Sequence, residues 1–381
     1  MSLRQSFTAR PWRVAAAVCV LATLVACGSS GGKKPEPTPL APNHALIGVR
    51  QAWTAQLGAS EAPLLPAVLG NELWLAGSTG TVLALDATTG QARWRADLAT
   101  PLSAGVGSDG TTAAVVTKAN ELVAIEAGRV TWRARLGAGV STPPLVAGRR
   151  VFVLGADRSL TAFDAANGLR LWTQSRPGDA LSLSQAGVLM AVGDTLVAGQ
   201  QGRLAGFNPQ NGSLRWEGVI ASPRGTNEIE RLVELVAGVS RQGNQLCVRA
   251  FQAAVGCVDA NRGTTLWTRS ANGAAGLAGD DQLLFGTEST GRVLAWQRAS
   301  GEPAWSSDRF LHRGLTAPVV VGRSVAFGDA TGYVHLLSRQ DGSLLNRLNT
   351  DGSGLVAAPV LAGDTLVAVT RKGMVFGWRP E

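Results

Sequence analysis

The feature that most constrains the fold is an internal repeat of roughly 40 residues that runs through most of the 381-residue chain. Each copy has an apolar segment, a glycine turn, a second apolar segment ending in Asp, a turn of the Asn-Gly type and a segment with a Trp, as in residues 73–94 and 151–172. The last position of the pattern holds, in chain order, Trp53, Trp94, Trp132, Trp172, Trp216, Trp267, Trp305 and Asn346. We expect these aromatic side chains to bury large areas between adjacent units.

The repeat predicts an all-β chain folded as an eight-bladed β-propeller. Short alternating segments bounded by Gly, Asp and Asn are typical of hairpins, and no stretch shows a sustained helical period. About four strands per repeat match one propeller blade. The last repeat, 358–378, stops before its Trp segment, whereas residues 51–57 form a Trp segment without a repeat of their own. We therefore expect the N-terminal strand to complete the C-terminal blade and close the ring over residues 44–381.

Residues 1–26 have the pattern of a lipoprotein signal peptide. Three Arg residues precede an apolar run, 14–25, that is too short to span a bilayer. The run ends in Leu24-Val25-Ala26-Cys27, which resembles a bacterial lipobox. That resemblance implies cleavage before Cys27 and acylation of its thiol and amino group; three acyl chains anchor a protein stably. Gly28 in place of Asp implies the outer membrane, and the alternative is an ordinary secretory signal with a chance Cys.

Residues 27–43 are predicted to be the lipidated Cys and a flexible tether. The stretch from 28 to 42 is rich in Gly, Ser and Pro, which favour extended or irregular backbone over a helix. A tether of this kind holds the folded domain in an aqueous compartment, the periplasm. The formal net charge of +8 comes from 35 basic and 27 acidic residues without a dense basic run, so nucleic acid is not an expected partner.

Two further motifs carry a family resemblance. One is Asn227-Glu-Ile-Glu-Arg-Leu-Val-Glu234, and the other is Leu311-His-Arg313 followed by Gly328-Asp329 and by Gly332-Tyr-Val-His335. With the lipobox, the tether and the eight repeats, they resemble the BamB family, propeller lipoproteins of the outer-membrane β-barrel assembly machinery (the BAM complex). The resemblance covers almost the whole chain. It implies a non-enzymatic scaffold without a cofactor, on the periplasmic side of the outer membrane.

The two longest repeat spacings mark the places where extra residues stand. Trp172 and Trp216 are 44 residues apart, and Trp216 and Trp267 are 51 apart, which places insertions around 177–190 and 218–235. Insertions in a repeat protein form loops on one face and often carry binding. These two regions are therefore the candidate partner-binding loops.

In the BamB family the corresponding loops dock onto a periplasmic POTRA domain of BamA, the barrel-forming subunit. By this resemblance Leu181 and Leu183 match paired loop leucines and would be the anchors, while Ser184 stands where an Arg is usual and Val236 where a second acid is usual. The predicted partner-binding residues are Leu181, Leu183, Ser184, Glu228, Glu230, Arg231 and Glu234. The alternative is that the leucines pack a blade edge and the charges form a solvated cluster. A further family proposal, guidance of outer-membrane protein precursors by exposed strand edges through β-augmentation, is not tested by the sequence.

Cys247 and Cys257 lie symmetrically about Gln252 in a predicted hairpin. Directly opposed strand residues are close enough for a disulfide in some registers, and the periplasm is oxidising. Paired buried thiols are the alternative.

Other apparent motifs do not indicate catalysis or metal binding. Residues 105–110 spell GxGxxG, but they precede an apparent strand rather than a helix. His44, His312 and His335 lack metal-ligand spacing. The repeats are also similar to those of pyrroloquinoline quinone enzymes, but the chain has no vicinal Cys pair. A quinoprotein-like enzyme and a ligand-binding propeller of the cell envelope are the alternatives to the scaffold.

Overall fold

The computed structural model describes residues 35–60, 64–176, 182–223, 226–227 and 231–381. The chain divides into two compact units, Met1–Glu36 and Pro37–Glu381, and every strand among the described residues lies in the second. The described residues contain no helix that is long and apolar enough to cross a membrane.

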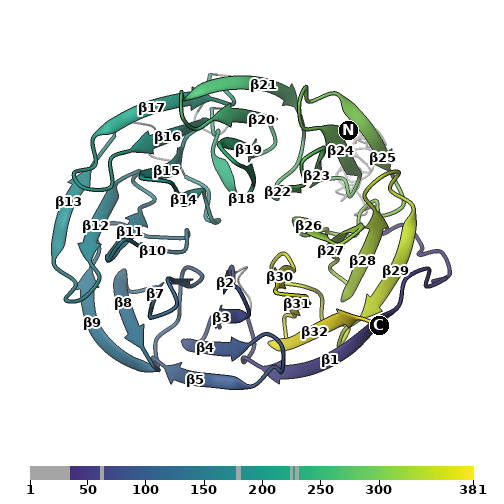
Figure 1. Cartoon of the computed structure of the whole chain (residues 1–381), viewed down its shortest axis with the longest axis horizontal. Coiled ribbons are helices and arrows are strands. Elements are labelled where there is room, and N and C mark those ends of the chain that lie inside the picture. Colours follow the sequence, from purple (N-terminus) through teal and green to yellow (C-terminus); the bar gives the residue numbers. More distant parts are fainter. Residues whose placement is uncertain (1–34, 61–63, 177–181, 224–225, 228–230) are drawn as a thin grey trace, which may run out of the picture. The chain divides into compact units, whose positions relative to one another are not determined.

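In the described part of the chain, 32 strands form eight four-stranded antiparallel sheets arranged as blades around a ring (Figure 1). Blades 1 to 4 contain β2 (Ala67–Leu69), β3 (Glu72–Ala76), β4 (Thr81–Asp86) and β5 (Ala92–Asp97); β6 (Gly107–Ser108), β7 (Thr112–Val116), β8 (Glu121–Glu126) and β9 (Arg129–Arg135); β10 (Leu145–Ala147), β11 (Arg150–Leu154), β12 (Leu160–Asp164) and β13 (Arg170–Gln174); and β14 (Leu189–Val192), β15 (Thr195–Gln200), β16 (Arg203–Phe207) and β17 (Leu214–Val219).

Blades 5 to 8 continue the ring in the same order. They contain β18 (Leu235–Gln242), β19 (Gln245–Ala250), β20 (Ala254–Asp259) and β21 (Thr264–Ser270); β22 (Leu277–Gly279), β23 (Leu283–Thr287), β24 (Val293–Gln297) and β25 (Pro303–Ser307); β26 (Val319–Val321), β27 (Ser324–Gly328), β28 (Tyr333–Ser338) and β29 (Leu344–Asn349); and β30 (Val360–Ala362), β31 (Thr365–Val369), β32 (Met374–Pro380) and β1 (Val49–Gln56). The eight-bladed propeller predicted from the repeat is confirmed.

The two termini close the ring by strand pairing. β1 pairs antiparallel with β32, from Val49 opposite Pro380 to Gln56 opposite Met374, so the N-terminal strand is the outer strand of blade 8. The predicted closure is therefore confirmed, and the eighth blade is held by hydrogen bonds between opposite ends of the chain. Without this pairing, the inner strands of blade 8 would present an open sheet edge.

The core lies between the blades rather than at the centre of the ring. Each of eight clusters of buried apolar residues draws its members from two neighbouring blades. The second and third strands of each blade are buried on both faces, which explains their near-continuous apolar sequences. The outer strands alternate between exposed and buried residues, because only one of their faces meets a neighbouring blade.

The repeated Trp and the Gly of the repeated turn belong to one contact between neighbouring blades. The indole N–H of Trp132 donates to the carbonyl oxygen of Ala165 at 2.7 Å, and the indole N–H of Trp267 donates to the carbonyl oxygen of Arg298 at 2.8 Å. A Cβ on Gly168, in the turn that follows Ala165, would come within 2.5 Å of the Trp132 ring. The turn therefore needs Gly both for its positive φ of 73° and for the space that the indole fills.

The antiparallel order gives the ring two different faces. The connections between blades and the turns between second and third strands share one face, which we call the loop face. The turns between first and second strands and between third and fourth strands share the opposite face, which we call the turn face.

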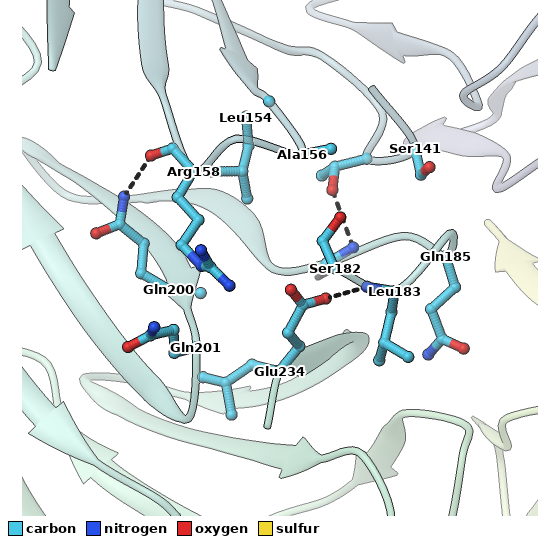
Figure 2. Close-up of a pocket in the computed structure, with 15 residues that line it drawn as sticks. Ser141, Leu154, Ala156, Arg158, Ser182, Leu183, Gln185, Gln200, Gln201 and Glu234 are labelled. Carbon is cyan, nitrogen blue, oxygen red and sulfur yellow. Dashed lines mark hydrogen bonds between the residues drawn. The ribbon is translucent and has the colours of Figure 1, made fainter. Parts of the chain in front are cut away.

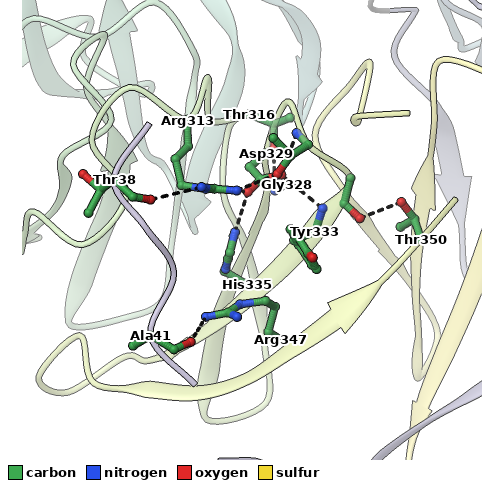
Figure 3. A network of polar contacts seen from close by, with 12 residues as sticks. Thr38, Ala41, Arg313, Thr316, Gly328, Asp329, Tyr333, His335, Arg347 and Thr350 are labelled. Carbon is green, nitrogen blue, oxygen red and sulfur yellow. Dashed lines mark hydrogen bonds and ion pairs between the residues drawn. The ribbon is translucent and has the colours of Figure 1, made fainter. Parts of the chain in front are cut away.

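Residues 38–46, which we call the N-terminal strap, lie along the outer strand β29 of blade 7. The N–H of Thr38 donates to the Leu311 carbonyl at 3.0 Å, and the N–H of Leu46 donates to the Leu345 carbonyl at 2.8 Å. Between these points Arg347 donates to the Ala41 carbonyl at 2.8 Å (Figure 3). Part of the stretch expected to be a flexible tether therefore contacts the propeller.

Candidate partner-docking site

The loops of the two predicted insertions meet on the loop face. The described part of the first loop, 182–188, leads into β14 of blade 4, and that of the second, 231–234, leads into β18 of blade 5. Gly187 forms an antiparallel bridge with Val236, and the N–H of Ala237 donates to the Ala186 carbonyl at 2.8 Å. The structure thus joins two regions that are about 50 residues apart in the sequence.

Leu183 and Glu234 connect the two loops directly. The backbone N–H of Leu183 donates to Oε2 of Glu234 at 2.9 Å (Figure 2). Burial raises the pKa of the Glu234 carboxyl, while the Leu183 N–H and the positive charge of Arg158 partly oppose that rise. The carboxylate thereby holds the backbone of the first loop, and the Leu183 side chain lies half-buried beside it.

The other predicted residues divide into those that the structure places and those that it does not. Ser184, which follows Leu183, and Arg231, three residues before Glu234, are both exposed. Leu181, Glu228 and Glu230 lie outside the described residues, as does Cys27. The described loop residues border a small hollow of about 50 Å³ that is also lined by Leu154, Gln200 and Gln201 (Figure 2).

Sequence reasoning missed Arg158, which lies in the turn between the second and third strands of blade 3. Its φ is +63°, in a region that side-chain-bearing residues seldom adopt. The corresponding turn of blade 1 has Gly80 at positive φ, whereas the turns of blades 4 and 5 have Gln201 and Gln252 at positive φ. A large polar residue where the turn favours Gly is the sequence signal that could have found these positions.

A second hollow, of about 240 Å³, lies beside the first and has a basic lining. Its lining residues carry three guanidinium groups, those of Arg158, Arg176 and Arg203, and one carboxylate, that of Glu217. Arg176 forms an ion pair with Glu217, and the nearest guanidinium nitrogen of Arg203 is 3.9 Å from it. This part of the loop face is suited to an acidic partner surface.

A disulfide joins Cys247 to Cys257, which stand directly opposite each other on β19 and β20. Both residues are fully buried between blades 5 and 6, beside Trp267. The bridge therefore reinforces the blade that follows the second loop.

No group of three or more His, Cys, Asp or Glu among the residues placed by the structure is arranged to hold a metal ion. His335 and Asp329 are instead part of a buried network in blade 7, with His335 Nε2 at 2.9 Å from Asp329 Oδ2 (Figure 3). Arg313 donates to the same carboxylate oxygen at 2.9 Å and to the carbonyl oxygen of Thr38 at 3.1 Å. These residues hold the N-terminal strap.

Comparisons with known proteins agree on one family. A family model described as outer membrane protein assembly factor BamB matches residues 78–307. The outer membrane protein assembly factor BamB of Burkholderia pseudomallei is 37% identical over 100% of both chains. That of Bordetella pertussis is 35% identical over 97% of this chain and 98% of its own. The chain belongs to the BamB family.

Solved structures share the propeller fold. BamB from Moraxella catarrhalis, at 24% identity, covers 87% of this chain and 99% of its own with a TM-score of 0.79. The quinohemoprotein alcohol dehydrogenase of Comamonas testosteroni, at 14% identity, aligns over 92% of this chain with a TM-score of 0.67. The second likeness shows that BamB and the quinoproteins have a similar ring, and it carries no argument about activity.

Proposed function

We propose that this protein is a non-enzymatic subunit of the outer-membrane protein assembly machinery that docks onto a POTRA domain of BamA through its loop face. Its relatives over the full chain length are named outer membrane protein assembly factors. The observation that carries the docking site is the contact between Leu183 and Glu234, because it builds one continuous surface from the insertions of consecutive blades.

The proposed docking surface has an apolar part and a charged part. Leu183, with Leu181, supplies the apolar contact that is desolvated when the partner binds, and such central contacts carry most of the affinity of an interface. Arg176 and Arg203 lie at its side and steer an acidic partner into register. The Glu234 carboxylate accepts a hydrogen bond from the Leu183 N–H and so fixes the backbone that carries the Leu183 side chain.

Cys27 is the proposed lipid anchor, with residues 1–26 removed as the signal and residues 44–381 forming the propeller. The strap contacts at Thr38 shorten the free part of the predicted tether. At about 3.3 Å per residue, the chain between Cys27 and Thr38 could span no more than roughly 36 Å. The propeller is thus proposed to work close to the periplasmic surface of the outer membrane.

The test is binding of the purified protein to the periplasmic domains of BamA from the same organism. A Leu181→Ala, Leu183→Ala variant is expected to bind at least tenfold more weakly. The matched control is Leu171→Ala, since Leu171 is 44% exposed on β13 but lies outside the loops. Its affinity is expected to stay within twofold of the unmodified protein.

Failure of the unmodified protein to bind would overturn the proposed function. Equal binding by the double leucine variant, with its fold intact by circular dichroism, would move the docking site elsewhere on the ring.

A further inference from the structure

Blade 7 departs from the rule that an outer-strand Trp packs on the next blade. Of the eight described outer strands, β29 has Asn346 at the position where the others have Trp. The reason lies in blade 8, where the third strand, β32, ends at Pro380 and β1 begins at Val49. No continuous turn with a Gly joins these two strands, because they come from the two ends of the chain.

The side chain opposite Asn346 has changed in the complementary sense. Leu336 pairs with Asn346, whereas Gly377 pairs with Trp53 and Ala84 pairs with Trp94. In the two Trp pairs the partner residue is small, Gly or Ala, whereas in blade 7 the smaller Asn346 has the larger Leu336 as its partner. This exchange keeps the strands paired, but Leu336 has less bulk than the indole that the other junctions contain.

A pocket of about 290 Å³ lies at this junction, on the turn face (we call it the closure pocket). Its apolar wall includes Val321, Leu336, Leu366, Trp378 and Pro380, together with Ile47, Val49 and Leu361. Ligand sites of ordinary size begin at about 300 Å³. The closure pocket is therefore large enough for one aromatic side chain or a ligand of that size.

Five residues of this wall correspond in position to residues that surround Trp53 at the next junction. Leu366 pairs with Trp378 in the register that Leu73 and Leu85 share. Two of the five come from blade 7: Val321 and Leu336 stand where Ala362 and Gly377 of blade 8 stand around the Trp53 indole. The other three come from blade 8: Leu366, Trp378 and Pro380 stand where Leu73, Leu85 and Ala87 of blade 1 stand around it. The closure pocket is thus the indole position of the ring, seen at the junction whose own strand supplies no indole.

The rim of the closure pocket lets a main chain approach. The turn between β26 and β27 has Gly322 at its tip, and a Cβ added there would meet no atom within 4 Å. Arg323 and Asp364 are exposed beside it. A peptide backbone can therefore lie over the turn while its side chain points inward.

We propose that the closure pocket binds an aromatic side chain, Trp or Phe, carried by an extended segment of a partner polypeptide. The site lies on the opposite face from the docking loops and does not depend on the function proposed for them. A partner bound there would leave the loop face free.

The experiment uses the purified protein and the peptide Gly-Gly-Trp-Gly-Gly, with Gly-Gly-Ala-Gly-Gly and N-acetyl-tryptophanamide for comparison. Methyl NMR of the protein reports where each probe binds. We expect saturable shifts of the Leu336 and Leu366 methyl groups with the Trp peptide and none with the Ala peptide. Shifts elsewhere on the ring, or none, would overturn the proposal, and binding of the free amide but not of the peptide would replace the polypeptide by a small molecule.

A variant that fills the closure pocket provides the second arm. Val321→Trp is expected to weaken binding of the Trp peptide at least tenfold. Leu69→Trp is the matched control, because Leu69 has the same place at the end of the inner strand of blade 1, beside a junction that already contains Trp94. Equal binding by both variants would contradict the assignment, and if Val321→Trp does not fold, the methyl shifts of the unmodified protein decide.

Discussion

The indole N–H of Trp53 donates to the carbonyl oxygen of Ala87 at 2.9 Å and so ties the last blade to the first. The same bond recurs between other neighbouring blades, for example from Trp305 to Arg339 at 2.8 Å. At the closure, however, Trp53 comes from the strand that the N-terminus contributes. The contact therefore helps to hold the ring shut in addition to packing two blades.

Replacing Gly90 by Ala is expected to destabilise the ring more than the same change at Gly70. Both glycines have positive φ, 72° and 58°, so each substitution carries a backbone cost of about 1 kcal/mol. A Cβ at Gly90 would also come within 2.5 Å of the Trp53 ring, whereas one at Gly70 would meet no atom within 4 Å. Urea unfolding should show an added loss of about 1–3 kcal/mol for Gly90→Ala. Equal losses would mean that the indole does not depend on this turn.

The fold could be predicted because the blades repeat one local pattern of strands, turns and an outer-strand Trp. The Trp spacing gave the number of blades, and the unpaired Trp segment at 51–57 showed how the ring closes. The contact between Leu183 and Glu234 could not be derived in this way, because the register between loops of different blades is set by packing across the ring. The strap was missed for a related reason: a Pro-rich segment shows no period, and its partners Arg313 and Arg347 are more than 270 residues away.

Replacing Gln252 by Gly is expected to stabilise the protein by about 1 kcal/mol. Gln252 is exposed and has a φ of 48°, which Gly adopts without steric cost. Asn120→Gly, in the corresponding turn of blade 2, should gain less, because Asn tolerates positive φ better than other residues do. Thermal unfolding of the two variants measures the difference. A loss of stability in Gln252→Gly would show that its side chain makes a contact worth more than the backbone strain.

Reduction of the bond between Cys247 and Cys257 is expected to lower the free energy of unfolding. The bridge closes a loop of roughly ten residues, for which loop-closure entropy gives up to about 3 kcal/mol. Adding a reductant should lower the urea midpoint of the unmodified protein. A Cys247→Ala, Cys257→Ala variant is the control, since its midpoint should not respond to the reductant. An unchanged midpoint in the unmodified protein would mean that the surrounding hairpin already provides this constraint.

Glu234→Gln is expected to change how stability depends on pH. Because burial raises the pKa of the Glu234 carboxyl, the folded protein holds its proton more tightly than the unfolded chain does. The carboxyl therefore costs stability progressively as the pH rises from about 4 through its raised pKa, and the cost stays constant above it. Gln has no charge to bury and keeps an oxygen for the Leu183 N–H. Between pH 4 and 7, the free energy of unfolding of the variant should rise relative to that of the unmodified protein as the pH increases. Parallel plots of the two free energies against pH would contradict the raised pKa.

Asp329 makes the stability of blade 7 sensitive to acid. Burial alone would raise its pKa, but the hydrogen bonds from His335, the Tyr333 N–H and Thr331 outweigh it and hold the pKa well below its usual range. Burial also lowers the pKa of His335, which is therefore neutral in the folded protein at pH 7. On acidification the unfolded chain binds a proton at His335 first, below about pH 6.5, and at Asp329 below about pH 4, so the folded state loses stability at both steps.

Arg313→Ala is expected to remove about 3–5 kcal/mol of stability, because it leaves the fully buried Asp329 carboxylate without its cationic partner. It also removes the donor to the Thr38 carbonyl, so hydrogen exchange in residues 38–46 should become faster. The control is Arg323→Ala: Arg323 donates to the Leu46 carbonyl at 3.3 Å from an exposed position, and its loss should cost less than about 1 kcal/mol. If exchange in residues 38–46 is equally slow in both variants, the strap is held by contacts other than the Arg313 network, such as Leu40 against the apolar cluster between blades 6 and 7.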